Sequence, residues 1–368
     1  MKGLVLQETR PRTAVFCVGS PLQFLCAIEA RARIGAEINA LVIRDPVRAR
    51  KGHMSQMGLL LERQEWTSIH HWPATTVPGA AGWFLAAWQA SRITRKLPKP
   101  CDVYVLGGFG QLRGQLLRSH LRPKITMIVD DGTSTLRHLE YYYALGKNCP
   151  DFIEKILEEQ TLSGVLKRWM LKLDRSVFDK PVTLFTGFDV HADQSGSANV
   201  VRHQFDKLKR RRVGQKVCFQ SVFYFGSPFS EKKILHLEVE LNLIKAISIH
   251  YMDQGLDFKY ISHRDDSPEK LRLLERAGVA CVTLGIPVEL YFATAQQIPG
   301  HIASITSSAL FNVKCIVEEV NAEVFPVVDL LKDERKRSHL RALRQYARVG
   351  IAVSDLLENF KSQPSSAS

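Results

Sequence analysis

The sequence predicts an α/β fold built from two Rossmann-like domains, whose parallel sheets face each other across a cleft. The chain has 368 residues, and domains usually run to about 100–200 residues, so two domains are expected. Short runs rich in Val and Ile alternate with helical stretches, as they do where parallel strands are buried on both faces. A basic, poorly apolar stretch at 206–216 separates two sets of such runs, so we place the domains at 1–215 and 216–368.

Ten short apolar runs are predicted as strands. Five precede the basic stretch, and they are Ala14–Val18, Ile38–Ile43, Val103–Leu106, Ile125–Val129 and Val182–Phe185. Five follow it, and they are Val217–Phe225, Phe258–Ile261, Ala280–Leu284, Ile302–Ile305 and Cys315–Val317. Helical patterns lie between them at Pro21–Ile34, Phe152–Lys172, Glu231–Asp253, Pro268–Ala277 and Pro287–Ala293. The end of the chain, Gln363–Ser368, is predicted to be a disordered tail.

The composition is that of a globular protein with a strong basic surplus. Apolar residues make up 45% and charged residues 24%, and 50 Lys and Arg against 37 Asp and Glu give a net charge of +13. This surplus predicts an anionic partner, which can be nucleic acid, a phosphorylated substrate or an anionic membrane surface. The seven cysteines are scattered without a CxxC pair, which indicates a reducing cytosol and neither a disulfide framework nor a structural zinc site. No run is long enough for a membrane span or a secretory signal, so we expect a cytoplasmic protein.

Two adjacent carboxylates follow the predicted strand Ile125–Val129. Ligands bind at the carboxyl ends of strands in open parallel sheets, so Asp130 and Asp131 are expected to bring at least one acid to the cleft rim. Such an acid can act as a general base, because burial or a neighbouring like charge raises its pKa. The alternative is a simple turn, since Asp-Gly is a common turn pair.

A histidine and an arginine follow the predicted strand Phe258–Ile261. His263 and Arg264 at a strand end can hold a phosphate, and the histidine can donate a proton to it. The alternative is a histidine packed at the strand end, with Asp265 or Asp266 capping the next helix.

Hydroxyl groups and one acid mark two further strand ends in the second half. Ser307 and Ser308 open an apolar helix, where hydroxyls and free backbone N–H groups together form an anion site. An ordinary N-cap explains one serine without a function. Glu289 lies in a first helical turn, where it can bind ribose hydroxyls or simply compensate the helix dipole.

Two glycine-containing turns link a strand to a helix in equivalent places of the two halves. Gly19 and Ser20 follow the first strand, and Gly226 and Ser227 follow the first strand of the second half. Both turns are rich in backbone donors at the position where nucleotides bind, but neither contains GxGxxG.

The order of these motifs resembles the bacterial GT-B sialyltransferases. An acidic pair followed by Gly, then a strand-end His, then a Ser pair, is similar to the lipooligosaccharide sialyltransferases of glycosyltransferase family 52, the bacterial polysialyltransferases and the marine multifunctional sialyltransferases. The turns at Gly19-Ser20 and Gly226-Ser227 look like the entries to the two domains of these enzymes. The resemblance covers roughly residues 14–320 as an ordered series of motifs.

The resemblance implies an inverting, metal-independent transfer from a CMP-activated donor and a role for each residue. Asp130 would deprotonate the acceptor hydroxyl, and Asp131 would position it. His263 would bind the donor phosphate and act as the acid on the departing CMP. Ser307 and Ser308 would hold the same phosphate, and Glu289 would bind the ribose. No cofactor or metal is implied.

The position after the histidine departs from the family pattern. Several of these families have His-Pro, whereas Arg264 follows His263 here. Arg264 adds a phosphate contact or marks another donor, such as CMP-Kdo or a UDP-sugar. The expected partners are therefore a nucleotide-sugar donor and a glycan or glycolipid acceptor.

The basic runs Lys207–Arg212 and Lys332–Arg348 admit three interpretations. They can bind nucleic acid, but neither is interleaved with the aromatic residues that a single-strand platform needs. The second run can be a solvated helix face. We favour peripheral contact with the anionic inner membrane, to which Trp83-Phe84-Leu85 and Trp88 would add apolar contacts unless they lie in the core. A non-catalytic glycan-binding or export protein is the remaining alternative.

Overall fold

A computed structural model describes residues 10–45, 51–61, 66–74, 77, 79–138, 146–190 and 199–357 of the chain. The chain forms two compact units, Met1–His203 and Gln204–Ser368. Each is an α/β unit with a parallel sheet. The predicted class, two Rossmann-like domains with parallel sheets, is therefore confirmed. The predicted tail Gln363–Ser368 lies outside the described residues.

The first unit contains a seven-stranded parallel sheet in the order β3-β2-β1-β4-β5-β6-β7. Its central strands are buried on both faces because most of their residues are apolar, as in Thr13–Val18. The strands are β1 (Thr13–Val18), β2 (Ile38–Arg44), β3 (Ser68–Trp72), β4 (Val103–Gly107), β5 (Ile125–Val129), β6 (Val182–Thr186) and β7 (Asn199–Arg202).

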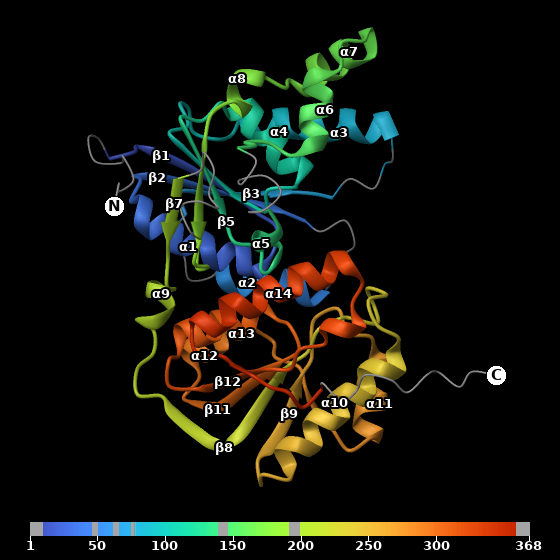
Figure 1. Cartoon of the computed structure of the whole chain (residues 1–368). Helices are drawn as coiled ribbons and strands as arrows, with labels where there is room; N and C mark the ends of the chain where they lie inside the picture. Colours follow the sequence, from blue (N-terminus) through green and yellow to red (C-terminus); the bar gives the residue numbers. More distant parts are fainter. Residues whose placement is uncertain are drawn as a thin grey trace, which may run out of the picture. The chain divides into compact units, whose positions relative to one another are not determined.

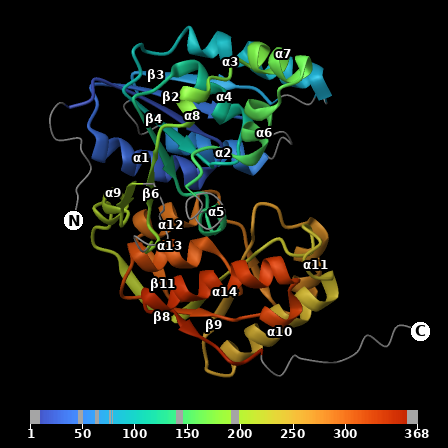
Figure 2. The ribbon, with the colours of Figure 1, turned by 45° about the horizontal axis from the view of Figure 1, so that its top comes forward.

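Helices cover both faces of this sheet (Figures 1 and 2). They are α1 (Pro21–Ile34), α2 (Lys51–Leu61), α3 (Gly79–Thr94), α4 (Leu112–Leu121), α5 (Ser134–His138), α6 (Asp151–Glu158), α7 (Leu162–Leu171) and α8 (Arg175–Phe178). Residues from α3, α4, α6 and α7 share one core with β1, β2 and β4. Figure 1 shows α1 and α2 on the opposite side of the sheet from α3 and α4.

The second unit contains a six-stranded parallel sheet in the order β10-β9-β8-β11-β12-β13. Tyr224 of its central strand packs on Tyr260 in the core shared with α10, whereas Phe223 and Phe225 contact Phe292 of α12 on the other face. The strands are β8 (Lys216–Phe225), β9 (Asp257–Ile261), β10 (Ala280–Val282), β11 (Gln297–Ser304), β12 (Asn321–Val324) and β13 (Ala352–Val353). The helices are α9 (Asp206–Lys209), α10 (Leu237–Met252), α11 (Pro268–Arg276), α12 (Val288–Thr294), α13 (Ser308–Ile316), the 3-10 helix η3 (Val328–Leu330) and α14 (Asp333–Arg348).

Some predicted elements are wrong, each for a local reason. Cys315–Val317 is the end of α13 rather than a strand. The predicted helix Phe152–Lys172 is two helices, because Thr161 accepts a hydrogen bond from the Gly164 N–H and starts α7 anew. The predicted helix Glu231–Asp253 begins only at Leu237, because the preceding segment forms turns.

The boundary between the units falls before the predicted one at residue 215. Residues 204–215 belong to the second unit, where α9 contacts α12 and α13. Lys209 and Arg212 form ion pairs with Glu318 and Glu319 of the same unit. The basic stretch is therefore part of the second unit's surface rather than a free linker.

Candidate functional sites at the strand ends

The strand order of each unit places a ligand-binding position at one edge of its sheet. The chain leaves β1 toward β2 on one side, and β4 lies on the other, so the order reverses between β1 and β4. It reverses in the same way between β8 and β11 in the second unit. Ligands of open α/β sheets bind outside the carboxyl ends of the strands at such points. The predicted site residues follow these strands or their neighbours.

Gly19 and Ser20 lie at the reversal point of the first unit, between β1 and α1. The Ser20 hydroxyl caps α1 by accepting a hydrogen bond from the Gln23 N–H at 3.2 Å. The Gly19 N–H donates to the Gln23 side-chain oxygen at 2.8 Å. A Cβ on Gly19 would lie 3.0 Å from the guanidinium of Arg44, so glycine lets this buried side chain approach the turn.

Arg44 is a buried cation directly below this turn. It is 4% exposed, and its guanidinium donates to Gln23 Oε1 at 3.1 Å, to Gln111 Oε1 at 3.1 Å and to the Gly107 carbonyl at 2.6 Å. All three acceptors are neutral. Arg44 therefore ties β2 to α1, to β4 and to the start of α4, and it places a positive charge at the reversal point, where an anionic group is favoured.

Asp130 is buried inside the first unit. It is 4% exposed; its Oδ2 accepts a hydrogen bond from the Gly187 N–H at 2.7 Å and pairs with His203 Nε2 at 3.3 Å. The His203 ring stacks on Phe185, 4.6 Å between centroids. Asp130 thus connects the end of β5 to the residues that follow β6 and β7.

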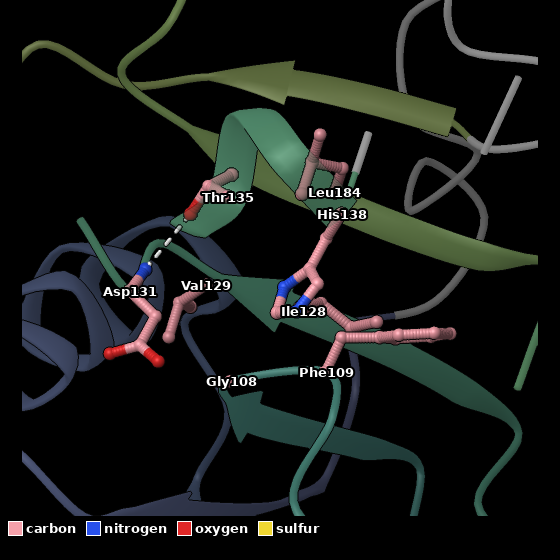
Figure 3. Close-up of a pocket in the computed structure, with 8 residues that line it drawn as sticks. All are labelled: Gly108, Phe109, Ile128, Val129, Asp131, Thr135, His138 and Leu184. Atoms are coloured by element: carbon pink, nitrogen blue, oxygen red, sulfur yellow. Dashed lines mark hydrogen bonds between the residues drawn. The ribbon is translucent and has the colours of Figure 1, made fainter. Parts of the chain in front are cut away.

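Asp131 is half-buried. Its backbone N–H donates to Thr135 Oγ1 at 2.9 Å, and Thr135 lies in the first turn of α5 (Figure 3). Its carboxylate accepts no hydrogen bond from the residues that the structure describes. A Cβ on Gly108 would lie 3.2 Å from Asp131 Oδ2 and 3.1 Å from Gln23 Nε2, so the carboxylate lies beside the reversal point.

A pocket lies against Asp131. Its empty space of about 210 Å³ includes open solvent, so it is a small surface hollow rather than an enclosed ligand cavity. The lining residues are Gly108, Phe109, Ile128, Val129, Asp131, Thr135, His138 and Leu184 (Figure 3).

Gly226 and Ser227 lie at the reversal point of the second unit. A Cβ on Gly226 would overlap the hydroxyl of Tyr260, so only glycine lets the turn pass over this side chain. The Ser227 hydroxyl donates to the Thr306 carbonyl at 3.1 Å. The turns after β8 and β11 are therefore bonded to each other.

His263 follows β9 and carries its ring proton on Nε2. The Asp265 N–H donates to Nδ1 at 3.1 Å, so Nδ1 is an acceptor and Nε2 is left as the donor. Burial and the charge of the adjacent Arg264 lower the pKa of His263 to about 4. At neutral pH this side chain is an uncharged hydrogen-bond donor, and exposed Arg264 beside it supplies the positive charge.

The loop that carries His263 is held by a buried lysine. Lys270 is fully buried; its ammonium bonds Glu240, Asp266 Oδ1 at 3.0 Å and the Ser227 carbonyl at 2.9 Å. Asp266 Oδ2 in turn accepts from the His263 N–H at 2.7 Å. Ser267 caps α11, so the sequence-based alternative of an Asp265 or Asp266 cap is wrong. The network fixes the turns after β8 and β9 together.

Ser307, Ser308 and Glu289 lie on the other side of β8. The Ser307 hydroxyl caps α13 by accepting from the Ala309 N–H at 3.3 Å, and Ser308 is the first residue of the helix. Glu289 is buried and accepts from Asn312 Nδ2 at 2.9 Å. Burial raises the pKa of Glu289, against the opposing effects of the Asn312 hydrogen bond and the Arg264 charge.

One group of side chains within the described ranges has the geometry to ligate a metal ion. Cys26, Asp130 and His203 are buried with one ligand atom each within 4.8 Å of the others. Within this group Asp130 Oδ2 lies 3.3 Å from His203 Nε2 and also accepts a hydrogen bond from the Gly187 N–H. Cys26 lies in α1, whereas Asp130 and His203 directly follow β5 and β7.

Several residues at the sites were missed from the sequence. Gln23, Arg44 and Gln111 support the first site, and Asn312 and Lys270 support the second. For Arg44 a signal exists, because a charged residue directly ends the apolar strand Ile38–Arg44. The partners of the other residues lie far away in the sequence, so no local pattern marks them.

The fold and the sites define an α/β protein with a strand-end polar site in each of two Rossmann-like units. No family model matches the chain, and no curated protein matches it. Among solved structures, it is similar to the crystal structure of TcCGT1 in complex with UDP, with 10% identity and a TM-score of 0.43 over 93% of this chain and 95% of that chain. A likeness of this size leaves donor and acceptor to be argued from this chain's own residues.

Proposed function

We propose that the protein is a GT-B glycosyltransferase that moves sialic acid, or a related nonulosonic acid, from a CMP-activated donor to a glycan or glycolipid acceptor. The observation that supports this most is the pairing of sites. In the first unit, the turn after β5 carries Asp131, whose carboxylate accepts no hydrogen bond from the described residues. In the second unit, the turn after β9 carries the neutral hydrogen-bond donor His263 beside the cation Arg264. We assign the acceptor to the first unit and the donor to the second.

The second unit supplies what a departing CMP needs. As the bond between the sugar C2 and the phosphate oxygen breaks, the electron pair goes to the phosphate. Donors aimed at that oxygen stabilise the charge that develops there. His263 Nε2–H, Arg264, the two serines and the first-turn N–H groups of α13 are such donors, and Glu289 faces the ribose in this proposal. The step needs no metal ion.

In the first unit we propose Asp131, rather than Asp130, as the base. The acceptor hydroxyl attacks the sugar carbon from the side opposite to CMP, which inverts the configuration, and its proton passes to the carboxylate. Asp131 is accessible and its carboxylate makes no hydrogen bond to the described part of the chain, whereas Asp130 is engaged with Gly187 and His203. Asp130 then positions β5 and the turn after it.

We place the reaction in the cytoplasm, with the enzyme in peripheral contact with the anionic inner leaflet, where a lipid-linked acceptor lies. In the described ranges, no helix has the length and apolar character that a membrane crossing requires. Arg44 adds a reason to expect an acidic acceptor, since among the described residues its guanidinium donates to three neutral oxygens.

Nucleotide selectivity tests the donor class. We expect CMP to raise the melting temperature of the protein, because a ligand that binds only the native state adds RT ln(1 + [L]/Kd) to its stability. UDP and GDP at equal concentration should raise it less. A larger shift with UDP would contradict the CMP donor and leave a transferase of another nucleotide sugar, and no shift with any nucleotide would favour a non-catalytic glycan-binding protein.

Proton uptake tests the role of His263. The pKa of about 4 keeps the free ring neutral, and a bound phosphate beside Nε2 should raise it, because a nearby anion favours the charged form. CMP binding near pH 6 should therefore take up protons through this ring, and each unit of pKa rise corresponds to about a tenfold gain in affinity at low pH. Calorimetry in buffers of different ionisation enthalpy measures this uptake.

The matched variant is His263→Asn, which keeps an acceptor near Nδ1 but cannot titrate. CMP's own phosphate titrates in both proteins, so the difference between them isolates the histidine. If both proteins take up the same number of protons, His263 does not contact the phosphate of bound CMP. The same lowered pKa means that His263 contributes stability above its ordinary pKa, and this contribution is lost as the pH falls toward 4.

A further inference from the structure

Helix α7 of the first unit carries its apolar stripe on the outside. Leu162 is 89% exposed, Val165 48%, Leu166 54% and Trp169 76%. Positions i, i+3, i+4 and i+7 of a helix share one face, so these four side chains form a continuous stripe. A surface helix of a globular protein normally turns such a stripe toward the core. Here it faces solvent.

The opposite side of α7 holds the helix in this orientation with polar contacts. The Arg168 guanidinium donates to the carbonyls of Ile156, Leu157 and Glu159, and Lys167 pairs with Glu159 at 3.1 Å. A Cβ on Gly164 would lie 2.5 Å from the Glu159 carbonyl, so the helix approaches this segment closely. Rotation of the stripe toward the core would break these contacts.

Helix α3 adds aromatic side chains next to α7. The two helices contact each other and lie side by side in Figure 2. Phe84 is 59% exposed and Trp88 is 47% exposed. The Lys172 ammonium at the end of α7 lies 3.4 Å from the Ser91 hydroxyl of α3. Together, Phe84, Trp88, Leu162, Val165, Leu166 and Trp169 form what we call the α3–α7 surface.

The segments that carry this surface have only positive charges. Residues 79–96 contain Arg92, Arg95 and Lys96, residues 161–173 contain Lys167, Arg168 and Lys172, and neither segment contains Asp or Glu. The Arg92 guanidinium lies over the Trp88 ring at 4.8 Å. Arg92, Arg95, Lys96 and Lys172 are exposed, so their charges are available beside the apolar side chains.

We infer that the α3–α7 surface docks on an anionic phospholipid bilayer. Large apolar and aromatic side chains enter the boundary between headgroups and acyl chains, while Lys and Arg on the same elements bind the anionic headgroups. Lys and Arg can lie along apolar surface and keep their charged ends in the headgroup layer. Every charged side chain within 79–96 and 161–173 is basic, and of the acids that flank α7, Glu159 and Asp174 are paired with Lys167 and Arg122. The exposed basic charge therefore matches an anionic membrane surface better than a protein partner of mixed charge.

This surface differs from the two basic runs expected to contact the membrane. In the run Lys207–Arg212, Lys209 and Arg212 are paired with Glu318 and Glu319, and Arg212 also donates to the Ile316 carbonyl at 3.2 Å. In α14, Lys336 is paired with Asp329 at 3.3 Å. Part of each run therefore stabilises the second unit. Of the aromatic residues named from the sequence, Phe84 and Trp88 do belong to the α3–α7 surface, while Trp83 packs against the core.

Vesicle flotation with the full chain tests the inference. We expect binding to phosphatidylcholine vesicles that contain about one third phosphatidylglycerol, weaker binding at high salt and little binding to pure phosphatidylcholine. The double variant Leu166→Glu/Trp169→Glu should bind the anionic vesicles at least about tenfold more weakly, because the acids oppose both the apolar and the charge contribution. Both side chains are exposed, so the variant should fold.

Val213→Glu is the matched control, since Val213 is an 84% exposed apolar residue of the second unit. It should bind vesicles like the parent protein. The inference is overturned if the parent binds neither vesicle or both equally, if the double variant binds as well as the parent, or if the double variant instead abolishes self-association of the chain in light scattering. CMP-induced stabilisation, measured on the same proteins, reports on the transferase proposal separately, because the inference does not rest on it.

Discussion

Replacing Asp131 by Asn is expected to lower transfer by about 10²–10⁴-fold, the usual contribution of a well-placed general base. The variant keeps the shape of the side chain and the backbone hydrogen bond to Thr135. It should therefore melt at the parent temperature and bind CMP with unchanged affinity. Release of CMP from the donor in the presence of acceptor measures the loss, and the nucleotide thermal shift shows that the second unit is intact.

Asp130→Asn is the matched variant one residue away. It removes the charge that faces His203 at 3.3 Å and weakens the acceptor of the Gly187 N–H, both inside the first unit. We expect lower stability of that unit, with turnover retained in the folded fraction. If Asp130→Asn is stable and inactive while Asp131→Asn keeps full turnover, the base is Asp130, as the motif resemblance implies, and our assignment is wrong.

Replacing Lys270 by Met is expected to destabilise the second unit by about 3–5 kcal/mol. Removing one member of a buried ion pair leaves the other charges uncompensated, and here Glu240, Asp266 and, at 3.8 Å, Glu231 surround one fully buried ammonium. The turns after β8 and β9 are both bonded to Lys270, so CMP binding should weaken as well. Calorimetric melting, with and without CMP, identifies the transition of this unit.

Lys259→Met provides the control for this loss. Lys259 pairs with Asp257 at 2.8 Å in the same sheet, but both side chains are well exposed, and such pairs contribute about 0–1 kcal/mol. The two variants remove the same group and differ in burial. A similar melting temperature for both would mean that water reaches the Lys270 network and that it does not hold the turns.

Burial on both faces explains which parts of the fold were predicted from the sequence. The strands β1, β2, β4, β5 and β6 are nearly continuous apolar runs, so they stand out in the sequence without any partner in view. Helix α1 has the predicted range Pro21–Ile34, and Ser20, Pro21 and Gly35 mark its ends chemically. These signals are local, and the structure agrees with them.

The strands that were not predicted lie toward the sheet edges, where strands are only partly buried and lack a continuous apolar run. β3 reads SIHHW, β7 reads NVVR and β12 reads NAEV, and each is exposed along part of its length. Their hydrogen bonds come from a neighbouring strand that is distant in sequence, such as β2 for β3. Short, half-polar segments of this kind become strands through tertiary pairing rather than through their own pattern.

The candidate sites divide in the same way. Position at a strand end follows from the sequence, because polar residues directly after a buried run must emerge at the sheet edge; this is why Asp130, Asp131, His263 and the two serines were found. Gly187 and His203 engage the Asp130 carboxylate, so Asp131 rather than Asp130 is the acid without a hydrogen bond from the described residues. The Asp265 N–H occupies Nδ1 of His263 and so leaves the ring proton on Nε2. The direction in which α7 turns its stripe depends on the carbonyls beside Arg168. These choices are made by hydrogen bonds and packing in three dimensions, so only the tertiary structure could decide them.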